Sequence, residues 1–548
     1  MNRKNKNNEP SVWLKAILTI AVLALFSFLT VKQLTPPEPK KSTVTVGKFS
    51  AVKAMNYLQN IARKPHPVNS REKDTVRDYI IRQLQGMGLA AVVQKTCMGD
   101  HQLENILTRV KGTASSGGLL LVAHYDSVPK SPGASDNGAA VAAALASLCE
   151  LQGMPPLKND VLVLFSDGEE VGLLGAINFL SEHPWSHEVT MVLNYEARGH
   201  KGPSLMFETN DQNGWIIAEF AKAAPFPRAY SWAFEVYKNM PNDTDFTVFK
   251  RKGFSGLNFA FIGGWKFYHT RNDNLENIDH GSLQHHGENM LPLLIHFGNL
   301  DLKNTKAGNR VFFSLFNTLV HYPGAMAFLL MIVACLAFFA VLFWGIKIGA
   351  LKLTRLFRGC VFFLIVLAVS ALVLFLAGKT IRHLEPDYHA GYFALAFASL
   401  ALGVFSLLYF FFLKRFPAPD LFAGVMFLYL ILTIAVQLLA PGASYMFTWP
   451  LLFGTIALAH ILKRKNPGWL DTVLQWLLVF PAFLILVPCI PLTVDALGIG
   501  FAFAAANLFL VLLAGAALPL FQVILKPLRL WTPGFLLAAG MIMLLVRH

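Results

Sequence analysis

Histidine and carboxylate side chains recur where short apolar segments end in the first half of this sequence. The members of this set are His124, Asp136, Glu169, Glu170, Glu196 and His269. Imidazole nitrogens together with carboxylate oxygens suit borderline metals such as zinc. A carboxylate that touches two ions would serve a site whose metals lie about 3.5–4 Å apart. Two adjacent glutamates cannot easily point at one atom, so one is expected to bind metal while the other holds a water for proton transfer.

The elements that must position these residues alternate between strands and helices. We expect strands at residues 89–96, 105–110, 119–123, 161–166, 189–195, 204–208 and 253–261, and helices at 49–61, 75–87, from 136, 172–181, 214–223, 245–250 and 281–300. This alternation predicts an α/β fold with a mainly parallel, mixed sheet flanked by helices. Ligand sites in such sheets are built at the carboxyl ends of strands, which is where the set lies.

Each residue of the set has an ordinary structural explanation when it is taken alone. An H-x-D pair is commonly a surface pair, adjacent glutamates commonly begin a helix, and Asp136 alone would be interpreted as an N-cap. The recurrence of such residues at one strand end after another favours a metal site over these explanations.

The composition predicts a membrane protein. Of the 548 residues, 54% are hydrophobic and only 15% are charged, whereas soluble domains are about a quarter charged. The 47 basic and 33 acidic residues give a net charge of +14. Many basic residues lie in short clusters between apolar runs, which favours membrane flanks over nucleic-acid binding. The five cysteines lack a CxxC pair, so we expect no disulfide framework, with Cys97 and Cys149 as buried free thiols.

Apolar runs divide the chain into domains. Residues 13–31 are long enough to cross a bilayer at ~1.5 Å per residue and lack the A-x-A pattern of a cleaved signal peptide. We therefore expect a cytoplasmic N-terminus over residues 1–12, an anchor over 13–31, a linker over 32–47 and a globular domain over 48–305. Residues 322–546 then form an all-α transmembrane domain of about eight helices, which gives roughly nine spans with the anchor.

Basic clusters in alternate loops predict the orientation of these spans. The clusters are Arg3/Lys4/Lys6, Lys347/Lys352/Arg355/Arg358, Lys414/Arg415, Lys463/Arg464/Lys465 and Lys526/Arg529. All of them lie in the cytoplasm if the N-terminus does, and the globular domain is then extracytoplasmic. Only one N-x-S/T sequon is present, at Asn242, so we favour a bacterial inner membrane and periplasm over the lumen of a eukaryotic organelle.

The motifs resemble those of a known family. The order H-x-D, SDNGA, D-G-E-E-x-G, N-x-E-A-R-G and Y-H-T-x-x-D is similar to the di-zinc aminopeptidases related to aminopeptidase Y and glutamate carboxypeptidase. Glu196, the segment 242–246, residues 65–67 and the multi-span second half most resemble the branch of vacuolar membrane proteases and endoplasmic-reticulum metallopeptidases. The resemblance covers about residues 48–300 by motif and the remainder by architecture only. It implies a zinc exopeptidase-like fold and two zinc ions.

Carried over by position, the resemblance assigns the ligands. Asp136 would bridge the two ions. His124 and Glu196 would complete the shell of one ion, and Glu170 and His269 would complete that of the other. Many relatives have Asp where this chain has Glu196, so the binding mode of the longer side chain stays open.

The resemblance also implies roles beside the metals. Glu169 would be the general base that takes a proton from the attacking water and returns it to the leaving amine. Tyr268 would help to stabilise the oxyanion, or would simply pack. Asp126 would orient His124 by accepting its other N–H, and Asp273 is a second supporting carboxylate. The candidates for substrate binding are Arg198, Asp243 and Asp245.

The expected function is a membrane-anchored zinc metallopeptidase, most simply an aminopeptidase, whose partners are a peptide and the lipid bilayer and not nucleic acid. Its oligomeric state is left open. One alternative is a non-catalytic receptor with a degenerate site, although every ligand is present. Another is a transporter with an accessory domain, although only His460 and Asp471, near span ends, are ionisable candidates for a pathway. A third is an amidohydrolase or a cyclase of N-terminal glutamine, with Trp232 and Trp265 as candidates for its pocket.

Overall fold

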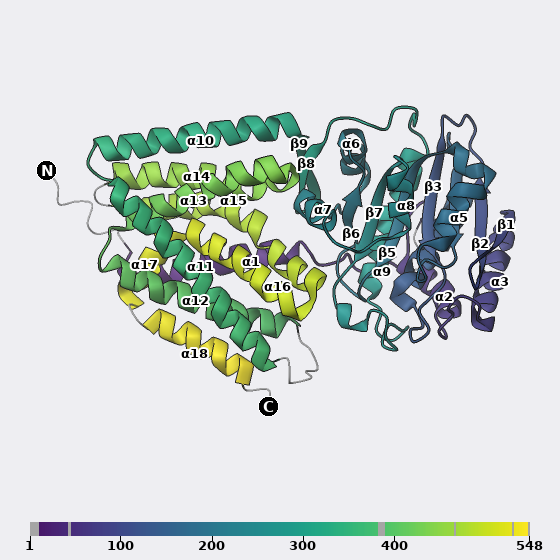
Figure 1. Cartoon of the computed structure of the whole chain (residues 1–548), viewed down its shortest axis with the longest axis horizontal. Helices are drawn as coiled ribbons and strands as arrows, with labels where there is room; N and C mark the ends of the chain where they lie inside the picture. Colours follow the sequence, from purple (N-terminus) through teal and green to yellow (C-terminus); the bar gives the residue numbers. More distant parts are fainter. Residues whose placement is uncertain (1–9, 42–44, 382–389, 465–466, 529–530, 546–548) are drawn as a thin grey trace. The chain divides into compact units, whose positions relative to one another are not determined.

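The computed structural model describes residues 10–41, 45–381, 390–464, 467–528 and 531–545. It divides into two compact units (Figure 1). The α/β unit comprises Leu34–Gly324, and the helical unit comprises Met1–Gln33 and Ala325–His548. Each unit is described separately below.

A seven-stranded sheet forms the centre of the α/β unit, with the order β1-β2-β4-β3-β5-β7-β6. Its strands are β1 (Ala91–Met98), β2 (His101–Val110), β3 (Gly118–His124), β4 (Val161–Ser166), β5 (Val189–Ala197), β6 (Leu205–Thr209) and β7 (Ser255–Phe261). The four central strands β4, β3, β5 and β7 are parallel, while β1, β2 and β6 pair antiparallel. The expected mixed, mainly parallel sheet is therefore confirmed.

Helices cover both faces of this sheet because its central strands are apolar throughout. The sequence GLLLVAH of β3 is buried at every position, as is typical of a parallel strand between two helical layers. Leu119 and Leu121 belong to the core shared with α2, α4 and α9, and Leu120 and Val122 to the core shared with α5 and α8. The helices of this unit are α2 (Ala51–Ile61), α3 (Arg71–Gly86), α4 (Ala140–Gln152), α5 (Leu174–Glu182), α6 (Gly214–Ala223), α7 (Ser231–Tyr237), α8 (Asp245–Arg251) and α9 (His280–Phe297).

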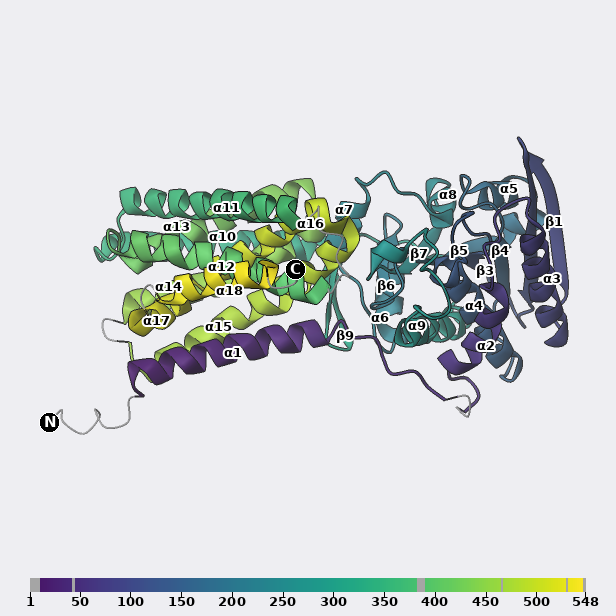
Figure 2. The same ribbon diagram turned by 90° about the horizontal axis from the view of Figure 1, so that it is seen from below.

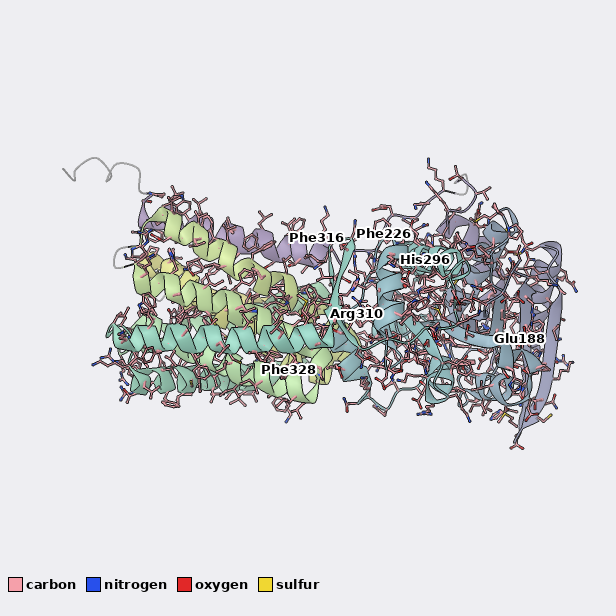
Figure 3. The ribbon with its side chains drawn as sticks, turned by 90° about the horizontal axis from the view of Figure 1, so that it is seen from above. Glu188, Phe226, His296, Arg310, Phe316 and Phe328 are labelled. Carbon is pink, nitrogen blue, oxygen red and sulfur yellow. The ribbon has the colours of Figure 1, made fainter. Side chains whose placement is uncertain are left out.

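Three features of the α/β unit differ from expectation. The Ala-rich helix α4 begins at Ala140 and not at residue 136, because an irregular turn, Ala134–Ala139, precedes it. The unit continues past residue 305 into a hairpin of β8 (Arg310–Leu315) and β9 (Thr318–Pro323), whose start and turn are marked by Arg310 and Phe316 in Figure 3. Cys97 and Cys149 are free thiols but exposed, since they lie on the outer sides of β1 and α4.

The helical unit contains α1 (Val12–Lys32), α10 (Gly324–Lys347), α11 (Leu353–Ile381), α12 (Ala390–Leu413), α13 (Ala418–Leu439), α14 (Tyr445–Lys463), α15 (Trp469–Leu486), α16 (Cys489–Ala516), α17 (Leu518–Leu528) and α18 (Trp531–Leu545). Among the described residues, seven helical segments are long and apolar enough to cross a membrane, or up to eight if a bent pair counts as one span. The expected number of about nine is therefore not reached by length and composition.

Two of the expected spans account for this difference. The run 499–521 is not one straight helix, because α16 and α17 meet at an angle of 78°. Pro519 at the start of α17 has no N–H to donate to the carbonyl of Gly515, and the loss of this hydrogen bond favours a bend there. The last apolar helix, Trp531–Leu544, is shorter than a typical span. The basic residues Arg3, Lys4, Lys6, Lys465 and Arg529 lie outside the described residues.

Candidate metal centre

Four neighbouring parallel strands deliver the candidate ligands to one edge of the sheet. His124 is the last residue of β3, and Glu196 is the penultimate residue of β5. Glu170 follows the end of β4, and His269 lies in the loop after β7. Because β4, β3, β5 and β7 are adjacent, their carboxyl ends lie side by side in the sheet (Figure 2).

Asp136 is the central residue of the cluster. Its Oδ1 lies 3.3 Å from Nε2 of His124, and its Oδ2 lies 3.1 Å from Nε2 of His269. Oε2 of Glu196 lies 3.4 Å from the same nitrogen of His124. Oε2 of Glu170 lies 3.1 Å from the same nitrogen of His269. The five side chains therefore form two groups of three that share Asp136 through opposite carboxylate oxygens.

The donor set fits a metal. His124, Asp136 and Glu170 each offer a ligand atom, and these atoms lie within 4.8 Å of one another. Oε1 of Glu170 is buried and has no hydrogen-bond partner among the described residues, although buried polar atoms normally have one. Imidazole and carboxylate donors in this arrangement are those that zinc accepts.

The electrostatics of the cluster reflect crowded carboxylates around two imidazoles. Burial, assisted by the charge of Asp136, raises the pKa of Glu170 to about 7. Burial opposes ionisation of Asp136, but its hydrogen bonds with His124 and His269 hold its pKa at about 2. Burial alone would lower the pKa of His269, whereas Asp136 and Glu170 raise it to about 10. A divalent cation would neutralise this concentration of negative charge.

Glu169 differs from Glu170 in its surroundings. Its carboxylate makes no hydrogen bond with any residue that the structure describes, and it lines the neighbouring cavity. Burial raises the pKa of Glu169 well above its usual value, and the nearby carboxylates of Glu196 and Asp245 raise it further. The side chain of Glu169 therefore lies beside the candidate ligands. Its buried carboxyl group favours the protonated form.

Asp126 holds the turn that carries the two glutamates. Its Oδ1 accepts the backbone N–H of Glu169 at 3.2 Å, and its Oδ2 accepts that of Glu170 at 3.3 Å. Nδ1 of His124 lies 3.0 Å from the backbone carbonyl of Asp126 and 3.5 Å from its carboxylate. The expected contact between Asp126 and His124 is thus made chiefly by the carbonyl oxygen, because the carboxylate is occupied by the two N–H groups.

Asp273 supports the central ligand from the opposite side. Its Oδ1 accepts the N–H of Ser135 at 2.7 Å, and its Oδ2 accepts the N–H of Asp136 at 3.1 Å. Asp136 itself is extended, with φ −109° and ψ 92°. These hydrogen bonds fix the backbone of the irregular turn, so the carboxylate of Asp136 is presented to both histidines and does not cap the helix.

A buried ion pair beneath the site was missed from the sequence. Nζ of Lys73 on α3 lies 2.8 Å from Oδ2 of Asp167, and both side chains are almost fully buried. The N–H of Asp167 donates to Oδ1 of Asn105 at 3.0 Å. Asp167 was visible within the D-G-E-E motif, but nothing distinguished Lys73 from the other charged residues of an amphipathic helix.

The substrate candidates have three different positions. Asp243 lines the cavity beside the candidate ligands, which is described below. Arg198 is not among the residues that line this cavity. Asp245 is fully buried, and its Oδ2 accepts a hydrogen bond from Ser166. Its carboxylate is therefore inaccessible to a substrate in this structure, unlike that of Asp243. Burial raises the pKa of Asp245 to about 7, and the charge of Glu196 adds to the effect.

The cavity beside the ligands has a volume of about 690 Å³. Its lining includes Glu169, Glu170 and Tyr268, and the ring of Tyr268 stacks on His269 with centroids 3.7 Å apart. Its other lining residues are Gly172, Leu173, Ile177, Leu180, Ser181, Asp243, Val248, Arg251 and Lys252. Neither Trp232 nor Trp265 is in this set. The lining of the cavity thus combines apolar side chains of α5, such as Ile177 and Leu180, with the cations Arg251 of α8 and Lys252.

Comparison with known proteins agrees with this geometry. Residues 105–294 match the family model described as Peptidase family M28. The chain is 32% identical to a vacuolar membrane protease of Candida dubliniensis, over 54% of this chain and 34% of that protein. It is 29% identical to endoplasmic reticulum metallopeptidase 1 of Mus musculus, over 55% of this chain and 37% of that protein. The chain therefore matches about a third of the length of these relatives. With its apolar helices, it is a multi-pass membrane protein.

Two solved structures are similar to a little less than half of this chain. One is a glutaminyl cyclase of Porphyromonas gingivalis, with 20% identity and a TM-score of 0.39 over 45% of this chain and 98% of that one. The other is a Zn-dependent exopeptidase of Parabacteroides distasonis, with 20% identity and a TM-score of 0.37 over 46% of this chain and 99% of that one. A likeness at this level does not bear on the activity.

Proposed function

We propose that this chain, which carries a peptidase family M28 domain, is a membrane-bound metallopeptidase that uses two zinc ions to remove residues from the amino end of peptides. The observation that carries the proposal is the position of Asp136, which contacts His124 and His269 through opposite oxygens. A carboxylate that faces two separate ligand groups is the arrangement required of a bridge between two ions.

The two ions would have separate ligand groups. His124, Asp136 and Glu196 would hold one ion, and Asp136, Glu170 and His269 would hold the other. When bound, zinc supplies a Lewis acid and lowers the pKa of a water molecule toward neutrality. The carboxylate of Glu196 lies 3.4 Å from Nε2 of His124, which supports a role for Glu196 as a ligand although its side chain is longer than that of an aspartate.

Glu169 would move the proton. Its carboxylate lies beside the ligand group, lines the cavity and has no other hydrogen bond among the described residues. It would accept a proton from the attacking water and deliver it to the leaving amine. A pKa raised by burial suits this role, because the protonated form must persist long enough to donate.

Tyr268 would donate to the carbonyl oxygen of the scissile bond. It lines the cavity, and its ring stacks on that of His269. Burial raises its pKa far above the working range, so its hydroxyl stays protonated and remains a hydrogen-bond donor. A fixed donor of this kind stabilises the charge that develops on the oxygen during attack.

The charges of the cavity support an amino-end orientation of the substrate. Glu169 lines the cavity and is not one of the proposed ligands, so its carboxylate, when ionised, would attract an α-ammonium group. The same lining includes Arg251, which pairs with Asp243 at 2.9 Å, and Lys252, whose side chain has no partner among the described residues. These cations would meet the carboxylate of a short peptide.

The proposed topology places the α/β unit outside the cytoplasm. It rests on the basic clusters in alternate loops, which include Lys347, Lys414 and Lys463. We propose a bacterial inner membrane with this unit in the periplasm.

Mass spectrometry of the products from a peptide library tests the proposed activity. The full-length protein should shorten peptides by one residue at a time from the amino end, and a chelator should abolish this. N-terminally acetylated peptides should resist cleavage, and carboxyl-terminal amidation should weaken cleavage of short peptides more than of long ones. Trimming from the carboxyl end, or cyclisation of N-terminal glutamine without cleavage, would contradict the proposal.

A further inference from the structure

A second cavity, of about 240 Å³, lies wholly within the helical unit. It is lined by residues of α1, α13, α14, α15 and α17 and of the connection between α14 and α15. None of these residues belongs to the metal centre. Figure 2 shows α1 running beside α15 and α17 in the same unit, in agreement with their contacts.

Specific contacts hold α1 in place beside this cavity. Nε1 of Trp476 on α15 donates to Oγ1 of Thr19 on α1 at 3.2 Å. The rings of Phe26 and Phe480 pack with centroids 4.4 Å apart. Thr19 is fully buried by this packing. The wall that α1 contributes is therefore anchored along the helix, and the cavity is a stable feature of the bundle.

Positive charge dominates the lining. The cavity contains three permanent cations, Lys15, Arg464 and Lys526, and a single carboxylate, Asp471. Lys526 is exposed, and its ammonium group has no partner among the described residues. The side chain of Arg464 is 60% exposed, and its Nε lies 3.5 Å from Asp471. Two cations at one cavity are therefore available to an anion.

The single carboxylate is already committed to partners within the protein. Oδ2 of Asp471 accepts the N–H of Gly468 at 2.6 Å, which caps the start of α15. Its Oδ1 lies 2.7 Å from Nε2 of His460. Asp471 thus binds the ends of α14 and α15 together, and it neutralises at most part of the positive charge around it.

Most of the other lining residues are apolar, and the polar ones among them are His460, Thr472, Gln475 and Gln522. The apolar residues include Val12, Phe422, Ile461, Leu518 and Val523. A soluble anion would gain nothing from this surface, whereas an acyl chain would bury against it. Cations at the mouth of an apolar cavity between spanning helices match a lipid with a negatively charged headgroup.

We propose that this cavity is a binding site for an anionic phospholipid. The phosphate region of the headgroup contacts Arg464 and Lys526, and the start of an acyl chain lies against Phe422 and Leu518. The site is independent of the peptidase proposal, because it shares no residue with the metal centre. Binding there holds α1 against α15 and α17 at the end of the unit where α1 begins.

Native mass spectrometry of the full-length protein in detergent tests this inference. The probes are phosphatidylglycerol, phosphatidylcholine with the same acyl chains, and inorganic phosphate. Wild-type protein should retain phosphatidylglycerol in preference to phosphatidylcholine, and millimolar phosphate should not displace it. The double variant Arg464→Gln/Lys526→Gln should weaken retention of phosphatidylglycerol by at least about fivefold, since each cation near the headgroup contributes to affinity.

Lys347→Gln/Lys352→Gln is the matched control, because it removes two cations at the α10–α11 connection, outside the cavity but at the same end of the unit (Figure 1). The control should retain the lipid as wild type does. Equal retention of the two lipids, equal losses in both double variants, or displacement by inorganic phosphate would each overturn the inference. The zinc content of all variants should equal that of wild type, which separates a failure of this site from a failure of the metal centre.

Discussion

Adjacent glutamates at the end of β4 have different environments. Both side chains line the cavity, but Glu170 also contacts His269 at 3.1 Å, whereas no ion pair or hydrogen bond joins the carboxylate of Glu169 to a described ligand residue. Asp126 holds the turn that carries both residues, because its carboxylate accepts both of their backbone N–H groups. One carboxylate is therefore placed to bind metal and the other to exchange a proton.

Substitution of Glu169 by Gln should separate these roles. Glu169→Gln keeps the shape of the side chain but cannot accept a proton, so kcat should fall by at least ~10²-fold while zinc content stays near that of wild type. The matched variant Glu170→Gln should instead lose zinc and regain part of its activity when zinc is added. Kinetics on a peptide substrate and elemental analysis of the same preparations measure both effects.

The contrary result would assign Glu169 a structural role. A carboxylate that only favours the start of α5 would contribute ~0.3–1 kcal/mol through the helix dipole. In that case Glu169→Gln would lower stability slightly and leave hydrolysis nearly intact.

At the scale of elements, a buried ion pair connects α3 to the turn after β4 that carries Glu169 and Glu170. Lys73 extends from α3 to Asp167, the residue that precedes Gly168 and Glu169, and both side chains of this pair are almost fully buried. Asp167 is in turn tied to Asn105 of β2. Burial raises the pKa of Asp167 to about 6, with Asp126 adding to the shift and Lys73 opposing it. The ion pair thus joins three elements beneath the metal centre.

Removal of one charge of the Lys73–Asp167 pair should lower the free energy of unfolding more than removal of both charges. Lys73→Met leaves Asp167 buried without its cation, and we expect a loss of about 3–5 kcal/mol in the free energy of unfolding. Lys73→Met with Asp167→Asn leaves no buried charge and should recover part of that loss. Chemical denaturation of the full-length protein in detergent, followed by tryptophan fluorescence, measures both variants. Equal stability of Lys73→Met and wild type would show that the pair does not stabilise this turn.

Most strands and helices of the α/β unit could be predicted because their patterns are local. The apolar run of β3 and the periodic pattern of α9 are evident in the sequence. The start of α4 was predicted too early, since Asp136 resembles an N-cap, whereas its backbone N–H donates to the carboxylate of Asp273 and its backbone is extended. The hairpin of β8 and β9 was missed because its strands are short and are held by contacts such as that of Ser231 with Phe312.

The candidate ligands could be predicted, but their arrangement could not. Recurrence at strand ends identified His124 and Glu196, yet only the sheet order β4-β3-β5-β7 brings them within 3.4 Å. Lys73 and the burial of Asp245 left no local signal, because both follow from packing between distant segments.

At the scale of the whole molecule, the length of the apolar helices indicates that they cross a membrane. The basic residues in alternate loops predict the direction in which they cross it. The turn Pro441–Ala443 joins α13 to α14, and the basic stretch 463–465 follows α14. These two connections should lie on opposite sides of the membrane if α14 spans it.

Reporter fusions test this topology. A reporter fused after Lys465, which lies outside the described residues, should be active only in the cytoplasm, and one fused at Ala443 should be active only outside it. The bend between α16 and α17 lies beyond both sites and cannot alter the outcome. The reverse pattern would place the α/β unit in the cytoplasm and contradict the proposed location.

The central claim is that Asp136 joins two ligand groups into a two-ion site, and the zinc content of the purified full-length protein tests it most directly. Elemental analysis of wild type supplied with zinc should give close to two ions per chain. Asp136→Asn should lose both, because among the described residues only Asp136 contacts both histidines. Asp243→Asn, which changes a cavity carboxylate outside the ligand groups, should keep both. Folded wild-type protein without zinc, or Asp136→Asn with its full zinc content, would contradict the account.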